Sequence, residues 1–170
     1  MPPSETIFYE TEAPQASREL AELRTSREYV PPFEVVRRRV IDDFYEGRMT
    51  IDATVVIRVG GVEQTEAARG VGVVNAFDLA LRKALFKYFP YLESVRVIET
   101  YSHASGESTE AEVMSVKKFS DGKVNWTTLA KSTNLVEAGW KSLVDGYEWR
   151  IVQEERKLRR QMENPRLSKR

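Results

Sequence analysis

Few residues of this chain belong to the types that carry catalytic chemistry. It contains one histidine, His103, and no cysteine, which excludes disulfides, thiolate nucleophiles and thiolate metal sites. A lone imidazole is most simply a solvated or packing residue, so we predict neither a catalytic residue nor a metal site. The glycines in Gly70-Val71-Gly72 suggest a phosphate loop, but no Lys-Ser or Lys-Thr pair follows them. A tight turn from a strand into a helix accounts for both glycines.

An internal duplication determines how these residues are positioned. Shifting the sequence by 62 positions, without a gap, places Gly60 on Gly122, Thr65 on Thr127 and Ala68 on Ala130. The same shift matches Arg69 with Lys131, Val74 with Val136, Ala76 with Ala138 and Leu81 with Leu143. Such a repeat predicts two copies packed with pseudo-twofold symmetry. We expect the function at the seam between them.

Each copy predicts strands followed by an amphipathic helix, so the fold class is α+β, with two tandem βββα units. Residues 49–59 alternate apolar and polar side chains, which is typical of a half-buried strand. The expected elements are strands at 33–44, 49–59 and 62–69, a hairpin turn at Gly60-Gly61, a helix from Val73 to before Pro90, strands at 94–104, 109–119 and 124–131, and a helix from Asn134 past Val152.

The same pattern predicts the domain organisation. Residues 1–32 contain several prolines and only a thin apolar stripe, which indicates a flexible N-terminal extension. Residues 33–152 form the folded domain, divided into units 33–90 and 93–152. Residues 153–170 form a helical extension that ends in a basic tail.

Composition restricts the classes of partner. The chain has 170 residues, 26 of them basic and 26 acidic, so charge gives no reason to expect binding to nucleic acid or to a membrane. We find neither a signal peptide nor a stretch that is apolar enough to span a bilayer. We therefore expect a soluble, cytoplasmic protein.

Three segments resemble a known family. GVGVVNAFDLALRKAL resembles GxGPVNALxxALRKAL, and STNLVEAGWKSLVDGYEW is similar to SxNIIEASWxALVDSxEY; both belong to the C-terminal regulatory domain of 2-isopropylmalate synthase and citramalate synthase. YSHASGESTEAEV resembles the Tyr-x-His-Ala strand and hairpin of leucine-pathway members. The segments follow the family's order and spacing over roughly residues 33–152. The resemblance implies two βββα units that dimerise and bind leucine or isoleucine, with no cofactor.

The resemblance also implies that this chain is not an enzyme. Synthases of the family carry a TIM barrel, in which a His-x-His pair and an aspartate hold a divalent metal. A barrel needs about 250 residues, and the single histidine here rules out a His-x-His pair. We therefore expect a regulatory domain that acts on a separate synthase.

The effector site is carried over from the matching segments. A zwitterion needs donors for its carboxylate, which the N-terminus of a helix supplies, and an apolar slot for its side chain. We expect Gly72 to let the backbone approach closely, and a bulky replacement to strain any positive φ. The family's proline falls on Val73, and Thr100 stands where leucine-pathway members have an aromatic residue. The expected effector residues are Gly70, Gly72, Val74, Asn75, Val97, Thr100, Tyr101, Ala104, Ala111 and Val113.

Three hypotheses remain open. The first is a homodimeric regulator that binds a branched-chain amino acid and controls a synthase, with Trp126, Trp140 and Trp149 supplying apolar surface for the dimer. The second is a structural dimerisation module that binds no ligand. The third, an enzyme built on the seam, is disfavoured by the scarcity of histidine, cysteine and clustered carboxylates.

Overall fold

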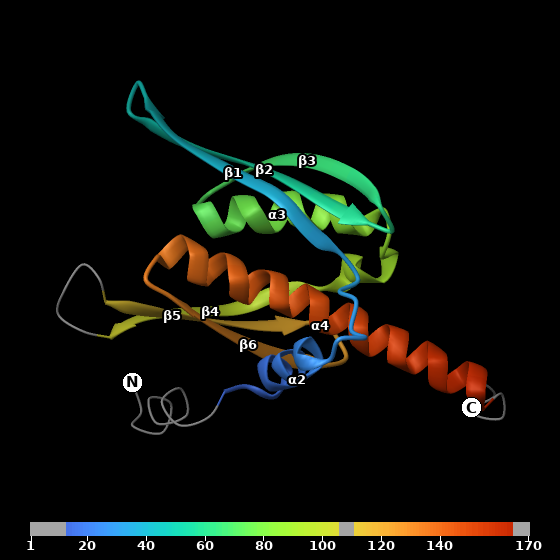
Figure 1. Cartoon of the computed structure of the whole chain (residues 1–170). Helices are drawn as coiled ribbons and strands as arrows, with labels where there is room; N and C mark the ends of the chain where they lie inside the picture. Colours follow the sequence, from blue (N-terminus) through green and yellow to red (C-terminus); the bar gives the residue numbers. More distant parts are fainter. Residues whose placement is uncertain (1–12, 106–110, 165–170) are drawn as a thin grey trace. The chain divides into compact units, whose positions relative to one another are not determined.

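The computed structural model describes residues 13–105 and 111–164. It confirms two successive βββα units, drawn in Figure 1. The elements are α2 (Gln15–Thr25), β1 (Glu34–Tyr45), β2 (Arg48–Val59), β3 (Val62–Gly70), α3 (Val73–Phe86), the 3₁₀ helix η1 (Pro90–Ser94), β4 (Arg96–Ser105), β5 (Glu112–Ser120), β6 (Asn125–Ser132) and α4 (Leu135–Glu163).

The chain divides into two compact units, which we describe separately. One contains β4–β6 together with the chain up to Tyr29 and the first part of α4, to Gly146. The other contains residues 30–93 and the chain from Tyr147 onward. These boundaries differ from the predicted ones at both ends of the chain. The pseudo-twofold relation between the units stays a prediction. The SGES turn, the first 12 residues and the end of the basic tail lie outside the described residues.

In the unit of β1–β3, the three strands form an antiparallel sheet in the order β1-β2-β3. Strict alternation along β2 places Ile51, Ala53, Val55 and Ile57 on one buried face. The buried residues of α3 cover this face; they are Ala76, Phe77, Ala80, Leu81, Ala84 and Leu85. The Tyr147 hydroxyl, from the second part of α4, donates a hydrogen bond of 2.6 Å to Asp78 of α3.

In the unit of β4–β6, the first part of α4 packs on the sheet and α2 closes one sheet edge. The N–H of Leu129 on the edge strand β6 donates to Ser17 Oγ at 2.8 Å, and the same hydroxyl donates to the Leu129 carbonyl at 3.4 Å. Ala16 and Leu20 of α2 are buried. The expectation of a flexible extension over residues 1–32 is therefore wrong for α2, because tertiary contacts order this short helix.

The duplication reappears in the backbone. Register shifts fall between Val35 and Arg37 in β1, and between Val97 and Glu99 in β4, so both lie at the 62-residue spacing. The turn residues Gly60 and Gly122 both have positive φ, 55° and 85°, a conformation that favours glycine. The two copies therefore share one backbone frame, although most of their side chains differ.

Not all of the tryptophans are exposed, as a role in a dimer interface would require. Trp126 and Trp140 are only 5% and 6% exposed, so they belong to the core of the chain and supply no free surface for a dimer. Trp149 is half-buried. The prediction of a homodimer therefore loses most of this support. Within the described residues, none of the helices has the length and apolar character needed to cross a membrane.

Candidate functional site

Of Gly70, which ends β3, and Gly72, which precedes α3, only Gly70 is in close contact. A Cβ built on Gly70 would lie 2.7 Å from Ala76 Cα and 2.7 Å from Asn75 Oδ1, whereas a Cβ on Gly72 would meet nothing within 4 Å. Gly72 has extended backbone, with φ −163°. The expectation of strain at a positive φ is therefore wrong for Gly72. Gly70 lets the strand and the helix approach closely, and Gly72 borders open space.

The helix that follows Gly72 begins without a side-chain cap. Its first amide groups have no partner within the helix, and the N-cap residue, Gly72, has no side chain to cap them. The Asn75 side chain instead accepts a hydrogen bond from the Val71 N–H at 3.0 Å. In the second copy the position equivalent to Gly72 is Asn134, whose Oδ1 accepts the Glu137 N–H at 3.0 Å. The repeat thus caps α4 and leaves the start of α3 open.

Ion pairs satisfy the charged side chains that precede this junction. Arg69 forms a two-pronged ion pair with Asp52, at 2.8 and 2.9 Å, and the hydrogen bond lowers the pKa of Asp52. Lys87 Nζ lies 2.6 Å from Glu66 Oε1, and this hydrogen bond lowers the pKa of Glu66. The amides and the dipole of α3 remain able to attract an anion at this junction.

Four of the predicted strand residues share one face of the β4–β6 sheet: Val97, Thr100, Ala104 and Val113. Thr100 pairs with Lys117 and Ala104 pairs with Val113 across β4 and β5. Tyr101 pairs with Val116 and therefore points to the opposite face, while Ala111 lies just before β5 begins. Thr100 and Ala104 are exposed. One side of the sheet thus carries most of the expected apolar slot.

The sequence analysis missed a buried lysine on this same face. Lys117 is 1% exposed, and its ammonium donates to Thr100 Oγ1 at 3.1 Å and to Ser115 Oγ at 3.3 Å. The Ser115 and Ser142 hydroxyls lie 3.2 Å apart, and Thr128 Oγ1 donates to the Ser142 carbonyl at 2.6 Å. We call these five residues, Thr100, Ser115, Lys117, Thr128 and Ser142, the lysine cluster.

The repeat contains the signal that would have revealed the lysine cluster. Lys117 falls on Val55, Ser115 on Ala53 and Ser142 on Ala80. These three residues of the first copy are fully buried and apolar. Applying the burial pattern of the first copy to the second would have predicted that Lys117 is buried, as Val55 is. The two sheets therefore have the same frame but chemically different inner faces.

The predicted site residues fall into two groups on different units. Gly70, Gly72, Val74 and Asn75 lie with β1–β3, and the strand residues lie with β4–β6. A pocket that joins the two groups stays a prediction. His103 is an exposed residue of β4. Among residues 13–105 and 111–164, no group of three or more His, Cys, Asp or Glu side chains is arranged to hold a metal ion.

The tandem βββα units fall within a known family of allosteric (dimerisation) domains. The family of the LeuA allosteric (dimerisation) domain matches residues 15–150, and the chain belongs to this family. Its start at residue 15 agrees with the docked position of α2.

The relatives are larger proteins. The chain is 32% identical over 151 residues to the (R)-citramalate synthase of Geobacter sulfurreducens, and 34% identical over 152 residues to that of Aquifex aeolicus. Each alignment covers 86% of this chain and 29% of the relative. The (R)-citramalate synthase of Sulfolobus acidocaldarius is 38% identical over 104 residues, which is 60% of this chain and 20% of the relative. The chain thus spans less than a third of the length of these relatives.

Proposed function

We propose that this domain binds a branched-chain amino acid, leucine or isoleucine, as a homodimer and thereby modulates a separate synthase of the isopropylmalate and citramalate type. The family and the synthase relatives support this class of function. Regulation requires that the amino acid bind two states of the regulated complex with different affinity. The chain itself supplies binding and coupling, and the chemical step belongs to the synthase.

The uncapped start of α3 is the observation that carries the proposal. Open space at Gly72 and the uncapped amides that follow it are suited to the carboxylate of an amino acid. In the second copy, Asn134 stands at the position of Gly72, and its side-chain oxygen caps the start of α4. A substitution that gives α3 the cap of α4 should therefore compete with the ligand for the same amides.

The second group of residues supports an apolar slot with a polar end. Val97, Ala104 and Val113 are small or branched side chains on one face of the sheet. Thr100 Oγ1 already accepts a hydrogen bond from Lys117, so its own hydrogen is left to donate. A ligand on this face would meet apolar groups and, beside them, a hydroxyl held in place by a lysine.

Gly72→Asn tests the proposal because two effects of opposite sign are expected. Asparagine at the N-cap should keep or slightly raise the stability of the helix, while its side chain occupies the amides and abolishes the heat of leucine or isoleucine binding. Calorimetry against leucine, isoleucine and valine, paired with thermal melts, measures both effects. Asn134→Gly is the matched control, which should lower stability by a few tenths of a kcal/mol and leave affinity unchanged. Unchanged affinity in Gly72→Asn would contradict a site at this helix.

The alternative is a dimerisation module that binds no effector. Two departures from the family pattern favour it: the family's proline falls on Val73, and Thr100 stands where leucine-pathway members have an aromatic residue. A dimer that gives no binding heat with any of the three amino acids would support this alternative and contradict effector binding.

A further inference from the structure

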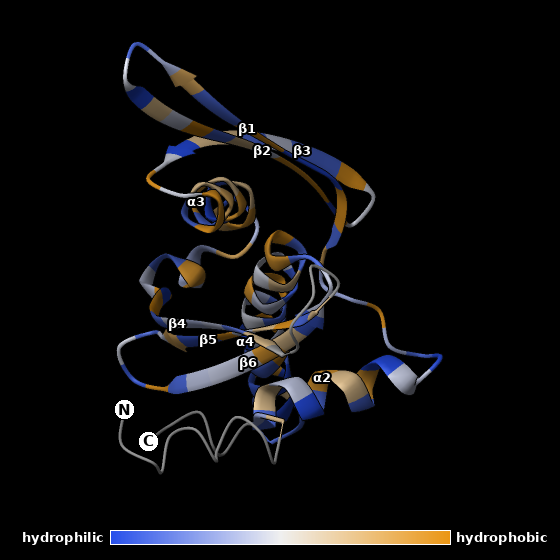
Figure 2. Ribbon diagram, turned by 90° about the vertical axis from the view of Figure 1, so that its left-hand side faces the viewer, coloured by the Kyte–Doolittle hydropathy of each residue, from blue (hydrophilic) through white to orange (hydrophobic). Residues whose placement is uncertain are grey.

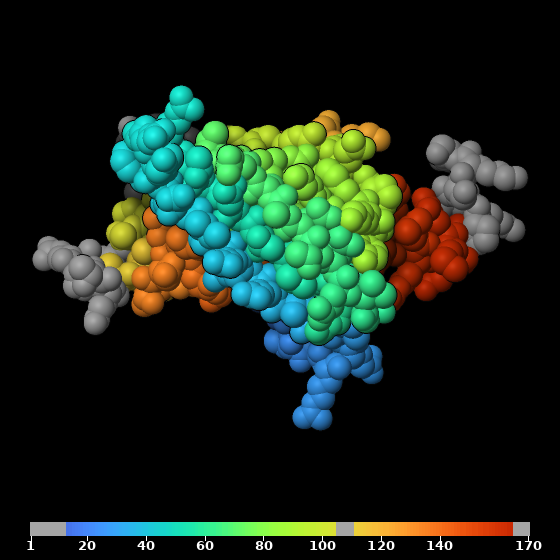
Figure 3. All heavy atoms as spheres, turned by 90° about the horizontal axis from the view of Figure 1, so that it is seen from above, coloured from blue at the N-terminus to red at the C-terminus, as the bar shows by residue number. Residues whose placement is uncertain are grey.

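Strand β1 is an edge strand of its sheet. The strand order β1-β2-β3 leaves one side of β1 without a strand partner in the described sheet. An edge strand presents a row of backbone N–H and C=O groups that can pair with another chain. Figure 3 shows β1, in blue to cyan, as a continuous strip on the face seen there. The strand has 12 residues, and its register is regular from Arg37 to Tyr45.

The outer half of β1 extends beyond the rest of its unit. β3 pairs with β2 only from Ile51 to Val59, so the β1–β2 hairpin continues past it as a two-stranded arm, visible in Figure 1. Glu46 and Gly47 at its turn have φ of 49° and 77°, as two-residue hairpin turns require. The arm is therefore a defined structure that leaves apolar side chains uncovered.

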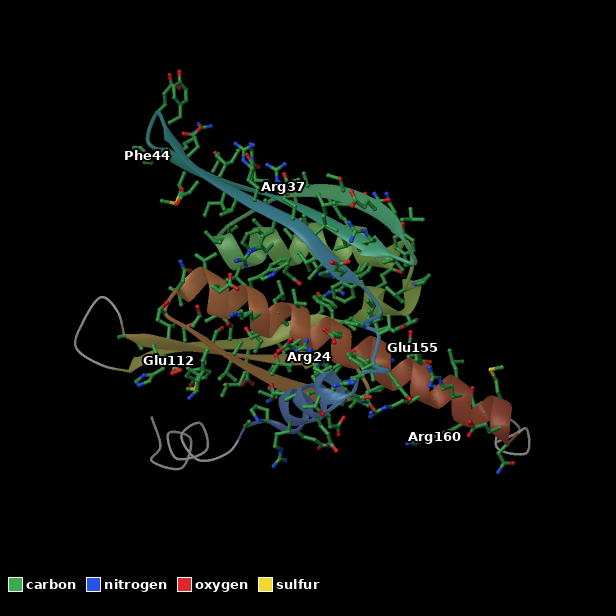
Figure 4. All side chains as sticks on the ribbon, in the orientation of Figure 1. Arg24, Arg37, Phe44, Glu112, Glu155 and Arg160 are labelled. Carbon is green, nitrogen blue, oxygen red and sulfur yellow. The ribbon has the colours of Figure 1, made fainter. Side chains whose placement is uncertain are left out.

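Exposed apolar residues lie on the arm, at Phe44 and Tyr45, and on β1 just before the arm, at Ile41. Ile41 is 45% exposed, Phe44 71% and Tyr45 70%. Figure 4 labels Arg37 and Phe44 on the strand, and Figure 2 shows apolar and polar stretches alternating along the arm. Isolated two-stranded hairpins are only marginally stable in water. A partner along the free edge would cover these side chains and widen the sheet.

The charges of β1 are arranged in two blocks of opposite sign. The sequence Arg37-Arg38-Arg39-Val40-Ile41-Asp42-Asp43 has three arginines before its apolar centre and two aspartates after it. Scattered charges usually protect an edge strand from self-pairing. Blocks of opposite sign act differently, because two antiparallel copies bring the basic block of one next to the acidic block of the other. A parallel alignment would instead bring like charges together.

We propose that two copies of this chain pair antiparallel through β1, with Ile41 on the twofold axis. Facing residues in an antiparallel pair point to the same side of the sheet. Ile41 then faces Ile41 of the partner subunit, and Arg39 faces Asp43 of the partner subunit, twice by symmetry. Arg37 faces Tyr45 of the partner subunit, which allows a cation–π contact. Three strands from each copy become one continuous sheet.

On the outward face, centring the pair on Val40 instead gives a poorer match, although on the inward face that register sets Arg38 opposite Asp42 of the partner subunit. Arg39 would then face Ile41 of the partner subunit, which leaves a charge beside an apolar group, and Asp43 would face Arg37 of the partner subunit. Only the register centred on Ile41 gives each of the five outward-facing residues, Arg37, Arg39, Ile41, Asp43 and Tyr45, a complementary neighbour. Arg39, Ile41 and Asp43 are all exposed in the single chain.

This inference rests on the proposed homodimer, and charge reversal tests it separately. Arg39→Glu places two pairs of acids together, and Asp43→Arg places two pairs of arginines together. Each variant alone should weaken dimerisation about tenfold or more, as measured by sedimentation. An equimolar mixture of the two should form mixed dimers, because both contacts are then of opposite sign. The double variant Arg39→Glu/Asp43→Arg should dimerise by itself.

The outcomes distinguish pairing through β1 from the more general proposal of a homodimer. Single variants that remain as dimeric as the parent chain would overturn pairing through β1 while leaving the homodimer intact. A monomeric parent chain at micromolar concentration would overturn both. Weakening by Asp43→Arg but not by Arg39→Glu would overturn the register centred on Ile41. Native mass spectrometry of the mixture identifies the mixed dimer, and Asp43→Asn, which removes charge without reversing it, should have a smaller effect.

Discussion

Gly146 of α4 lies directly against the ring of Phe119 on β5. A Cβ on Gly146 would overlap this ring, which is stacked on Trp126 with centroids 5.5 Å apart. The Trp126 indole donates to the Gly146 carbonyl at 3.0 Å. In the first copy the equivalent residues are Ile57 and Ala84, both fully buried. The second copy therefore combines a larger strand residue with a smaller helix residue.

This pairing predicts a compensating double variant. Gly146→Ala should destabilise the protein by about 1–3 kcal/mol, because the added methyl group forces the ring out of its site. Phe119→Ile/Gly146→Ala, which introduces the pair of the first copy, should recover part of this loss. Denaturant unfolding of both single variants and the double variant gives the coupling energy. An additive cycle would show that the two residues are energetically independent.

The two glycines before α3 should respond differently to alanine. Gly70→Ala drives a methyl group against the backbone of Ala76 and against the Asn75 side chain, so a loss of about 1–3 kcal/mol is expected. Gly72→Ala enters open space with an extended backbone and should cost less than about 1 kcal/mol, the usual effect of alanine at an N-cap. Thermal melts followed by circular dichroism compare the two, and equal losses would contradict the close contact at Gly70.

Lys117 should be replaceable without loss of the fold. Buried charged groups are often matched in stability by apolar residues of similar volume, so Lys117→Met should change the free energy of unfolding by less than about 2 kcal/mol. Affinity for the effector should fall, because Lys117 no longer donates the hydrogen bond that holds the Thr100 hydroxyl in place. Lys118→Met is the control: Lys118 forms an ion pair with Glu99 at 3.2 Å, and its loss should alter neither property. A Lys117→Met variant that fails to fold would show that the ammonium is structurally essential.

The protein should lose stability at alkaline pH through Tyr91. Partial burial, with a further contribution from Glu155, raises the pKa of Tyr91 from 10.0 to about 12. The Arg150 guanidinium lies 5.5 Å from the ring centroid. Between these two pKa values the unfolded chain has released the phenol proton and the folded chain has retained it, so stability falls as pH rises. Tyr91→Phe should flatten the fall in melts across this range, and an unchanged slope would contradict the shift.

The sequence predicted the architecture well, because the repeat and the alternation of side chains both depend on local spacing. The 62-residue shift predicted the equivalent turns at Gly60 and Gly122, and the structure extends it to the register shifts in β1 and β4. The sequence alone does not predict that α2 is ordered, because its apolar stripe is thin and its order comes from contacts with β6.

The candidate site was harder to predict. Local turn chemistry could not show which glycine before α3 is in close contact, since that depends on where the helix packs. Single-strand alternation also did not show that Lys117 is covered by a helix. Comparison with Val55 in the first copy would have done so. A pocket that joins the two groups of residues stays a prediction, because the two groups lie in different units.

The contact between Ser17 and Leu129 has a consequence for the order of folding. It joins residues 112 positions apart, whereas β1, β2, β3 and α3 are contiguous between Glu34 and Phe86. During synthesis the sheet of β1–β3 can form early, because its contacts are local. α2 is made before that sheet, yet its docking site on β6 emerges only after β5. We therefore expect the first helix to be among the last elements to dock, so a ribosome-bound chain that ends before β6 should leave Ser17 accessible.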